Sequence, residues 1–177
     1  MRKTVLYIAM SLDGYIADEN GKVDWLDGEN EEIESEDSYA RFIKRVDTVV
    51  MGWNTYYQVI SELSPSKWVY EDLMTYVITH RENKSSDNIK FIHDPLDKFI
   101  REIKLQKGKD IWICGGADIV SQLLKEDLID EFYITVIPVL LGKGISLFNK
   151  IKKELKLLTC RKNGRMVEMI YERKNTI

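Results

Sequence analysis

The stretch Asp110–Phe148, DIWICGGADIVSQLLKEDLIDEFYITVIPVLLGKGISLF, decides the fold class of this chain. Its opening apolar run, Ile111–Cys114, suits a buried strand, and an amphipathic helix pattern begins directly after Gly115 and Gly116. A second strand is predicted over Phe132–Val136. Strand, Gly-Gly, helix and strand in this order indicate a crossover between parallel strands. The two glycines leave backbone N–H groups at the start of the helix free to bind phosphate.

Patterns on both sides of this unit predict a single α/β domain. Short apolar runs predict further strands at Thr4–Ala9, Thr48–Met51, Thr75–Thr79 and Ile89–Ile92. Helices are predicted over residues 35–46, over residues 53–63 with Asn54 as a cap, and from an Asp94-Pro95 cap to Leu105. In the tail, two strand runs flank Asn163-Gly164, which is typical of a tight hairpin. We therefore predict a doubly wound, mostly parallel sheet with an antiparallel C-terminal hairpin.

Length and composition narrow the class of protein. The 177 residues fit one domain, residues 1–177, and a hydrophobic content of 44% is enough for a buried core. A net charge of −3 argues against nucleic acid as a partner. No apolar run approaches the about 20 residues of a membrane span, so we expect a cytoplasmic protein. Two histidines and two cysteines without metal-ligand spacing argue against a zinc site.

Three loops at the ends of predicted strands carry the unusual residues. They are Ser11-Leu12-Asp13-Gly14, Gly52-Trp53-Asn54-Thr55 and Gly115-Gly116. Ligands of an open α/β sheet bind outside the carboxyl ends of the strands, so these loops should converge. A fourth segment, Thr79-His80-Arg81, offers a hydroxyl, an imidazole and a guanidinium group. Such a set suits a phosphate, for example the 2′-phosphate of NADP.

Taken together, four segments resemble the dihydrofolate reductase superfamily. They are AMSLDGYIA (9–17), VVMGWNTYY (49–57), ICGGADIVSQL (113–123) and PVLLGKGISLF (138–148). The likeness is greatest to the branch that contains the reductase domain of the bifunctional riboflavin-biosynthesis deaminase-reductase, and it covers residues 5–171. It implies a dihydrofolate-reductase-like fold, NADPH as the hydride donor, a small-molecule substrate and a homodimer.

The same resemblance implies roles for individual positions. The cofactor phosphates would be received by Gly52, Trp53, Asn54 and Thr55, and the 2′-phosphate by Thr79, His80 and Arg81. The pyrophosphate and nicotinamide would be lined by Gly115, Gly116, Ala117, Asp118 and Ile119. Ala9 and Ile16 would flank the nicotinamide, while Ser11 and Thr135 would contact the substrate.

The acid that orients the substrate has three candidates. Dihydrofolate reductases grip the pterin with one acidic residue on their first helix, and that place falls near Glu36 or Asp37. Asp13 is the third candidate, because its loop has the appearance of the riboflavin branch. We therefore expect Asp13→Asn to impair reduction of a ribosylated aminopyrimidine more than a change at Glu36 or Asp37.

Three functions fit the sequence. The first is NADPH-dependent reduction of a small pyrimidine-like or pterin-like substrate, resembling the 5-amino-6-(5-phosphoribosylamino)uracil reductase reaction. The second is dihydrofolate reduction, which requires a buried acid against the pterin. The third is a nucleotide-binding module that kept the fold without the chemistry, because fold does not determine function. Turnover of one substrate and not the other would separate the first two, and cofactor binding without turnover would indicate the third.

Overall fold

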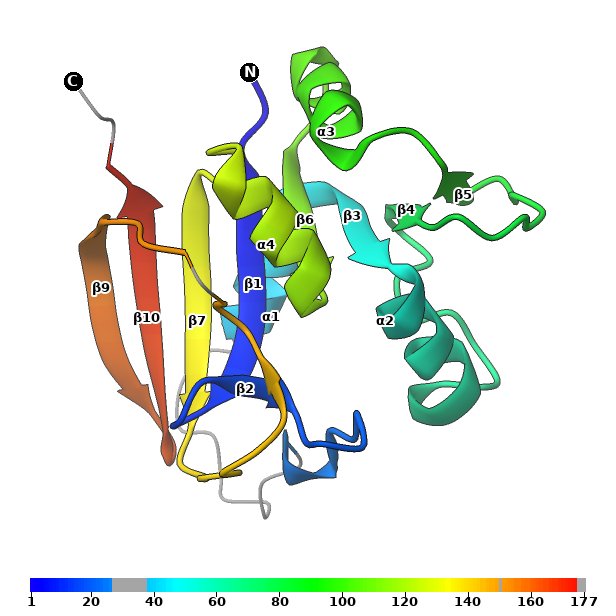
Figure 1. Ribbon diagram of the computed structural model, residues 1–177. Coiled ribbons are helices and arrows are strands. Elements are labelled where there is room, and N and C mark those ends of the chain that lie inside the picture. Colours follow the sequence, from blue (N-terminus) through cyan, green and yellow to red (C-terminus); the bar gives the residue numbers. More distant parts are fainter. Residues whose placement is uncertain (27–37, 150, 175–177) are drawn as a thin grey trace.

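The molecule is built on an eight-stranded sheet with helices on both faces (Figure 1). The computed structural model describes residues 1–26, 38–149 and 151–174. The strands are β1 (Thr4–Ser11), β2 (Tyr15–Ala17), β3 (Val46–Gly52), β4 (Met74–Ile78), β5 (Ile89–Ile92), β6 (Asp110–Gly115), β7 (Glu131–Ile137), β8 (Ile145–Ser146), β9 (Leu155–Asn163) and β10 (Met166–Arg173). The helices are α1 (Ser38–Ile43), α2 (Trp53–Gln58), α3 (Leu96–Leu105) and α4 (Ala117–Lys125), with a 3-10 turn η1 (Asp24–Leu26) and a π-helical turn η2 (Val59–Leu63).

The strand order confirms the predicted topology. The large sheet runs β5-β4-β3-β6-β1-β7-β10-β9, and β1 lies parallel to both β6 and β7. Only the C-terminal hairpin breaks the parallel arrangement, since β10 is antiparallel to β7 and to β9. Asn163 pairs with Met166, and Gly164 takes a φ of +56° in the turn between them. Glycine adopts this conformation without the cost of a Cβ, which explains the Asn-Gly signal.

The core has two parts, one on each face of the sheet. On one face, α3 and α4 bury their apolar sides against Leu6, Ile113 and Phe132. On the other face, Phe42 of α1 packs with Trp112 and with the strand residues around it.

Within the described ranges, no helix is long and apolar enough to cross a membrane.

Several boundaries differ from the sequence-based prediction. The helix predicted over residues 35–46 ends at Ile43, because Val46 already belongs to β3 and pairs with Asp110. The predicted caps at Asn54 and Asp94 are wrong: Gly52 and Pro95 occupy the N-cap positions of α2 and α3. The first loop also contains β2, whose pairing with the distant β8 no local pattern indicates.

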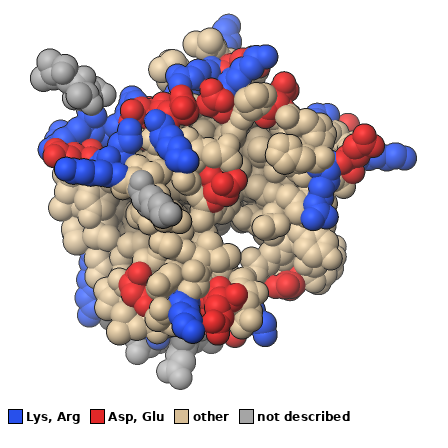
Figure 2. All heavy atoms as spheres, in the orientation of Figure 1, with Lys and Arg blue, Asp and Glu red and all other residues tan. Residues whose placement is uncertain are grey.

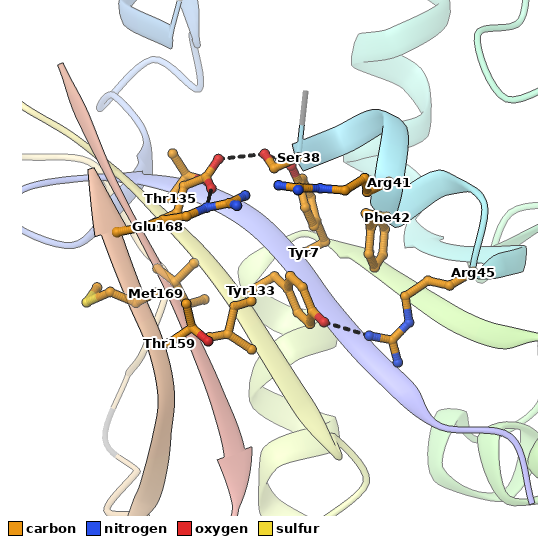
Figure 3. Close-up of a pocket in the computed structure, with 13 residues that line it drawn as sticks. Tyr7, Ser38, Arg41, Phe42, Arg45, Tyr133, Thr135, Thr159, Glu168 and Met169 are labelled. Atoms are coloured by element: carbon orange, nitrogen blue, oxygen red, sulfur yellow. Dashed lines mark hydrogen bonds and ion pairs between the residues drawn. The ribbon is translucent and has the colours of Figure 1, made fainter. Parts of the chain in front are cut away.

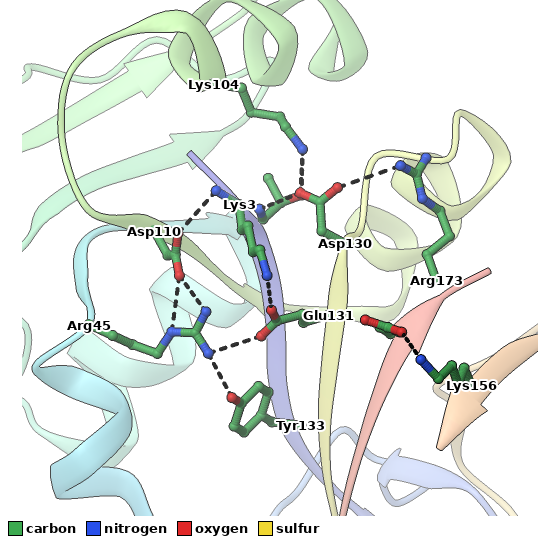
Figure 4. Close-up of polar contacts among 11 residues, drawn as sticks. Lys3, Arg45, Lys104, Asp110, Asp130, Glu131, Tyr133, Lys156 and Arg173 are labelled. Carbon is green, nitrogen blue, oxygen red and sulfur yellow. Dashed lines mark hydrogen bonds and ion pairs between the residues drawn. The ribbon is translucent and has the colours of Figure 1, made fainter. Parts of the chain in front are cut away.

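Ion pairs join the strands at the end of the sheet that lies away from the predicted loops (Figure 4). Arg45 binds Asp110 at the start of β6 and, at 2.9 Å, Glu131 at the start of β7. Burial lowers the pKa of Arg45, but hydrogen bonds to the two carboxylates outweigh burial and raise it overall. Lys3 also binds Glu131, at 2.5 Å. Ion pairs therefore connect the amino-terminal ends of these strands, whereas the predicted ligand-binding loops follow their carboxyl ends.

Candidate active site

The loops after β3 and β6 converge, as the sequence predicts. These strands are parallel neighbours, and Met51 pairs with Gly115. A methyl group in place of a Gly116 hydrogen would lie 3.4 Å from Oγ1 of Thr55 and 3.8 Å from Cδ1 of Ile16. A methyl group on Gly52 would lie 3.3 Å from Cγ1 of Ile119. The Gly52 contact is tighter than most Cβ contacts, whereas the contacts at Gly116 are ordinary, so a larger side chain than a methyl group would be needed to fill the space at Gly116.

The two helices that start here have uncapped N-termini. Gly52 precedes α2 and Gly116 precedes α4, and neither N-cap makes a side-chain hydrogen bond within the described chain. The first N–H groups of a helix lack intrahelical acceptors, so those of α4 are available to a ligand. Figure 2 shows a hollow near the centre of this face, where Figure 1 places the space between α4 and α2. Both positively and negatively charged side chains surround this hollow, and neither sign predominates there.

The Thr79-His80-Arg81 segment lies beside the start of α2. The guanidinium carbon of Arg81 is 5.0 Å from the centre of the Trp53 ring, which is a cation–π contact. The backbone N–H of Arg81 donates to Oγ1 of Thr79 at 3.0 Å, while the Thr79 carbonyl lies 2.8 Å from Nδ1 of His93. Arg81 is therefore held near the helix start, and His80 is exposed next to it.

Two of the predicted polar cofactor residues face solvent. Asn54 is exposed on the first turn of α2, and Asp118 is exposed on the first turn of α4. The Asp118 carboxylate accepts a hydrogen bond of 2.8 Å from the Gln122 side chain one turn later. Ala117, between Gly116 and Asp118, is half-buried. Contacts of these residues with a cofactor stay predictions.

Asp13 connects the first loop to the loop after β7. Its carboxylate accepts hydrogen bonds from the backbone N–H of Leu141 at 3.1 Å and of Gly142 at 2.7 Å. The Ser11 hydroxyl donates to it at 2.6 Å, and this bond is the largest of the effects that lower the pKa of Asp13. Asp13 thus organises the loop, and its role as a catalytic acid stays a prediction. Ser11 is fully buried, so direct contact with a substrate also stays a prediction.

A cavity of about 320 Å³ lies between α1 and the sheet (Figure 3). It is lined by Tyr7, Ser38, Arg41, Phe42, Arg45, Tyr133, Ile134, Thr135, Thr159, Arg161, Glu168, Met169 and Ile170. Its volume is at the lower end of small-molecule sites, which start at about 300 Å³. The predicted substrate residue Thr135 lines it, and Thr135 pairs with the predicted nicotinamide residue Ala9 on β1. The cavity therefore adjoins the predicted reaction site.

One wall of the cavity is aromatic. Tyr7 stacks on Phe42 with ring centres 4.3 Å apart, and Tyr133 lies 6.1 Å from Tyr7 at an interplanar angle of 28°. Such rings offer flat apolar surface to a planar heterocycle. The hydroxyl of Tyr133 accepts a 2.6 Å hydrogen bond from Arg45, so its ring is fixed in place.

The other end of the cavity is polar. Glu168 of β10 accepts hydrogen bonds from Ser38 at 2.5 Å, from Arg161 at 2.6 Å and from Asn163 at 2.9 Å. Sequence reasoning missed this carboxylate, because it sits in the tail hairpin, far along the chain from the other site residues. Period-two alternation could have placed it on one face of its strand, but not beside Thr135. Glu36 and Asp37 lie outside the described residues, directly before Ser38.

Comparison with known proteins identifies the family of this chain. Residues 2–168 match the family described as the RibD C-terminal domain. The chain is 45% identical over 175 residues to the uncharacterized protein YwjB of Bacillus subtilis (strain 168), covering 97% of this chain and 98% of that one.

Solved structures support the fold in the same way. A Shewanella sp. PV-4 protein assigned by name to riboflavin biosynthesis is 30% identical with a TM-score of 0.85, covering 98% of this chain and 99% of that one. The diaminohydroxyphosphoribosylaminopyrimidine deaminase/5-amino-6-(5-phosphoribosylamino)uracil reductase of Thermotoga maritima has a TM-score of 0.68 at 14% identity. The alignment covers 98% of this chain but 57% of that protein, and it shows the fold alone.

Proposed function

Because the chain belongs to the RibD C-terminal domain family, whose fold is that of dihydrofolate reductase, we propose that it is an NADPH-dependent reductase. The substrate we propose is a small aminopyrimidine or pterin-like heterocycle, as in the reaction named for the Thermotoga maritima protein. One observation carries the proposal: Thr135, which lines the aromatic cavity, pairs with Ala9 of β1 near the carboxyl end of the sheet, where the Gly52 and Gly115-Gly116 loops also meet.

We expect the space between α2 and α4 to hold the dinucleotide. A Cβ on Gly116 would project toward Thr55 and Ile16, so the glycine keeps room for a close backbone approach to a pyrophosphate. The free N–H groups of α4 would bind that pyrophosphate, and Arg81 would bind a 2′-phosphate. NADPH supplies the hydride when bound. Ala9 and Ile16 would position the nicotinamide ring, with Thr135 on the substrate side.

The protein's own contribution is positioning and exclusion of water. The apolar wall of Tyr7, Phe42 and Tyr133 would hold a planar ring and keep solvent from one of its faces. The loops held together by Asp13 would cover the site from the side of β2 and β8. Asp13, Glu36 and Asp37 stay the predicted candidates for the acid that orients the substrate.

Replacing Gly116 tests the cofactor site. We expect Gly116→Val to abolish NADPH binding, measured by quenching of tryptophan fluorescence, because its branched side chain would fill the space beside Thr55. Gly116→Ala is the matched control, since its single methyl group at 3.4 Å makes an ordinary contact and should weaken binding less. Both variants should keep the wild-type circular dichroism spectrum. NADPH binding by a folded Gly116→Val protein would exclude this site.

The proposal includes a cytoplasmic homodimer. Leu157 and Leu158 are exposed on β9, which is an edge strand of the large sheet. An exposed apolar edge strand is a surface that proteins commonly cover by pairing. Sedimentation velocity should show twice the chain mass of 20.7 kDa, and a monomer at micromolar concentration would contradict the dimer.

A further inference from the structure

Glu168 occupies an unusual position for a carboxylate, since only 8% of the residue is exposed and it lines the cavity. It pairs with Thr135 across β10 and β7, and Thr135 pairs with Ala9 across β7 and β1. Arg161 continues the same row on β9. Directly paired residues point to the same face of a sheet, so the acid lies in line with the predicted nicotinamide and substrate positions.

The hydrogen bonds to Glu168 leave it able to accept another. Oε1 receives the Ser38 hydroxyl and the Asn163 amide, whereas Oε2 receives only the Arg161 Nε–H among the described residues. An ionised carboxylate has about four acceptor sites. Three donors on two separate elements, α1 and β9, fix the orientation of the group, and Oε2 keeps a lone pair. Figure 3 shows the carboxylate at the end of the cavity next to Thr135 and facing α1.

The group is an anion at neutral pH. Burial raises the pKa of Glu168, but hydrogen bonds from Ser38, Asn163 and Arg161 outweigh burial and lower the pKa overall. An ionised carboxylate only accepts hydrogen bonds, so a ligand that meets it must present N–H or O–H groups. Bonds of this kind are about twice as strong as those between neutral groups.

We propose that Glu168, on the C-terminal hairpin, is a substrate-recognition residue that accepts hydrogen bonds from the N–H groups of an aminopyrimidine ring lying against Tyr7, Phe42 and Tyr133. This inference rests on the proposed function for its substrate class. It assigns the acid that orients the heterocycle to β10, in place of the candidates Asp13, Glu36 and Asp37. Ser38 of α1 then acts as a positioning residue, because its hydroxyl holds Oε1 in place.

A purely structural role for Glu168 makes a different prediction. In that case the carboxylate only ties α1 to the hairpin through Ser38 and Arg161, and its neutral amide would lower stability without changing ligand selectivity. Selectivity between two rings that differ only in amino groups therefore separates the two roles. Binding of both rings is measured without cofactor, so the test is independent of reductase activity.

The probes are 5,6-diaminouracil, which carries two adjacent amino groups, and uracil, which carries none. By isothermal titration, wild type should bind 5,6-diaminouracil more tightly than uracil. Glu168→Gln should weaken binding of the diamine at least about tenfold, because one charge-assisted hydrogen bond is lost. It should change uracil binding less than about twofold, and NADPH binding should be unchanged. Equal loss for both rings, or no loss for either, would overturn the inference.

Glu172→Gln is the matched control on the same strand. Glu172 forms an exposed 2.8 Å ion pair with Lys156 and lies outside the cavity, so its amide should leave binding of both rings unchanged. If Glu168→Gln does not fold, a crystal of the wild type soaked in 5,6-diaminouracil decides the question. A ring or amino nitrogen within about 3.2 Å of Oε2 supports the proposal, and a ring bound elsewhere contradicts it. If wild type prefers 5,6-diaminouracil over uracil through Glu168 but does not oxidise NADPH, the result counts against the proposed function and not against this inference.

Discussion

Arg81 is the residue on which the preference between NADPH and NADH should depend. Its guanidinium lies over the Trp53 ring at the first position of α2, while its backbone N–H is tied to the Thr79 hydroxyl. Stacking holds the planar donor group in place before any ligand arrives, which lowers the entropic cost of binding a phosphate. The sequence pointed to this segment from its residue types alone, but it did not reveal that Trp53 supports Arg81.

We expect Arg81→Ala to weaken NADPH about 10- to 100-fold, the equivalent of a charge-assisted hydrogen bond of about 1.5–3 kcal/mol. NADH lacks the 2′-phosphate, so its affinity should change less than about twofold. Fluorescence titration with both cofactors measures the two effects together. Arg81→Lys is the control, because it keeps the charge but loses the planar donors. Its NADPH affinity should lie between those of wild type and Arg81→Ala. Equal weakening of NADPH and NADH would show that Arg81 does not contact the 2′-phosphate.

At the scale of elements, the sequence predicted what local patterns encode. The strand–Gly-Gly–helix unit and the Asn163-Gly164 hairpin are confirmed, because each depends on residues that are close in the chain. The β2–β8 pairing and the place of Glu168 beside Thr135 were missed, since each joins segments more than 30 residues apart. Their formation depends on tertiary packing, which periodicity does not report.

Asp13 should control the order of the loop after β7. Its folded-state pKa lies below the ordinary value of 3.8, so the carboxylate is ionised and binds the N–H groups of Leu141 and Gly142 at higher pH. This contribution is complete well above pH 3.8 and is lost as the pH falls through the lower folded-state pKa.

We therefore expect the Leu141 and Gly142 amides to be protected from hydrogen exchange at neutral pH and to lose protection in Asp13→Asn. The asparagine side chain has a single acceptor oxygen and no charge, so it cannot hold both N–H groups equally well. Exchange measured by NMR at single amides tests this directly. Amides of the β1–β6 ladder are the internal control, and their protection should be the same in both proteins. Unchanged protection at Leu141 and Gly142 would show that the loop is held by other contacts.

For the whole molecule, the two ends of the sheet have separate tasks. The carboxyl ends of β1, β3, β6 and β7 carry the loops and glycines of the candidate site. The amino-terminal ends of β1, β6 and β7 are joined by charged pairs, and Asp130, directly before β7, binds Lys104 at the end of α3 (Figure 4). Such a division lets the loops change with function while the charges keep the strands in register.

The pair of Lys104 and Asp130 should matter most for stability, because Lys104 is only 5% exposed. Lys104→Met keeps the apolar stem but removes the nearer of the two cations beside the half-buried Asp130 carboxylate and leaves Arg173 at 3.7 Å. We therefore expect a loss of about 1.5–3 kcal/mol in the free energy of unfolding. Lys156→Met is the control, since its pair with Glu172 is exposed and should contribute about 0–1 kcal/mol. Urea unfolding monitored by circular dichroism gives both values.

The pH dependence of that loss identifies its cause. Burial raises the pKa of Asp130, but the Lys104 hydrogen bond and the Thr4 contacts outweigh burial and lower it below 3.8. Wild type gains this stability above pH 3.8 and loses it as the pH falls through the folded-state value. In Lys104→Met the carboxylate loses its main partner, its pKa rises, and it takes up a proton at higher pH than in wild type. The deficit of Lys104→Met should therefore shrink between pH 7 and about pH 4. A deficit that is constant over this range would mean that lost packing of the lysine stem, and not the lost charge interaction with Asp130, destabilises the variant.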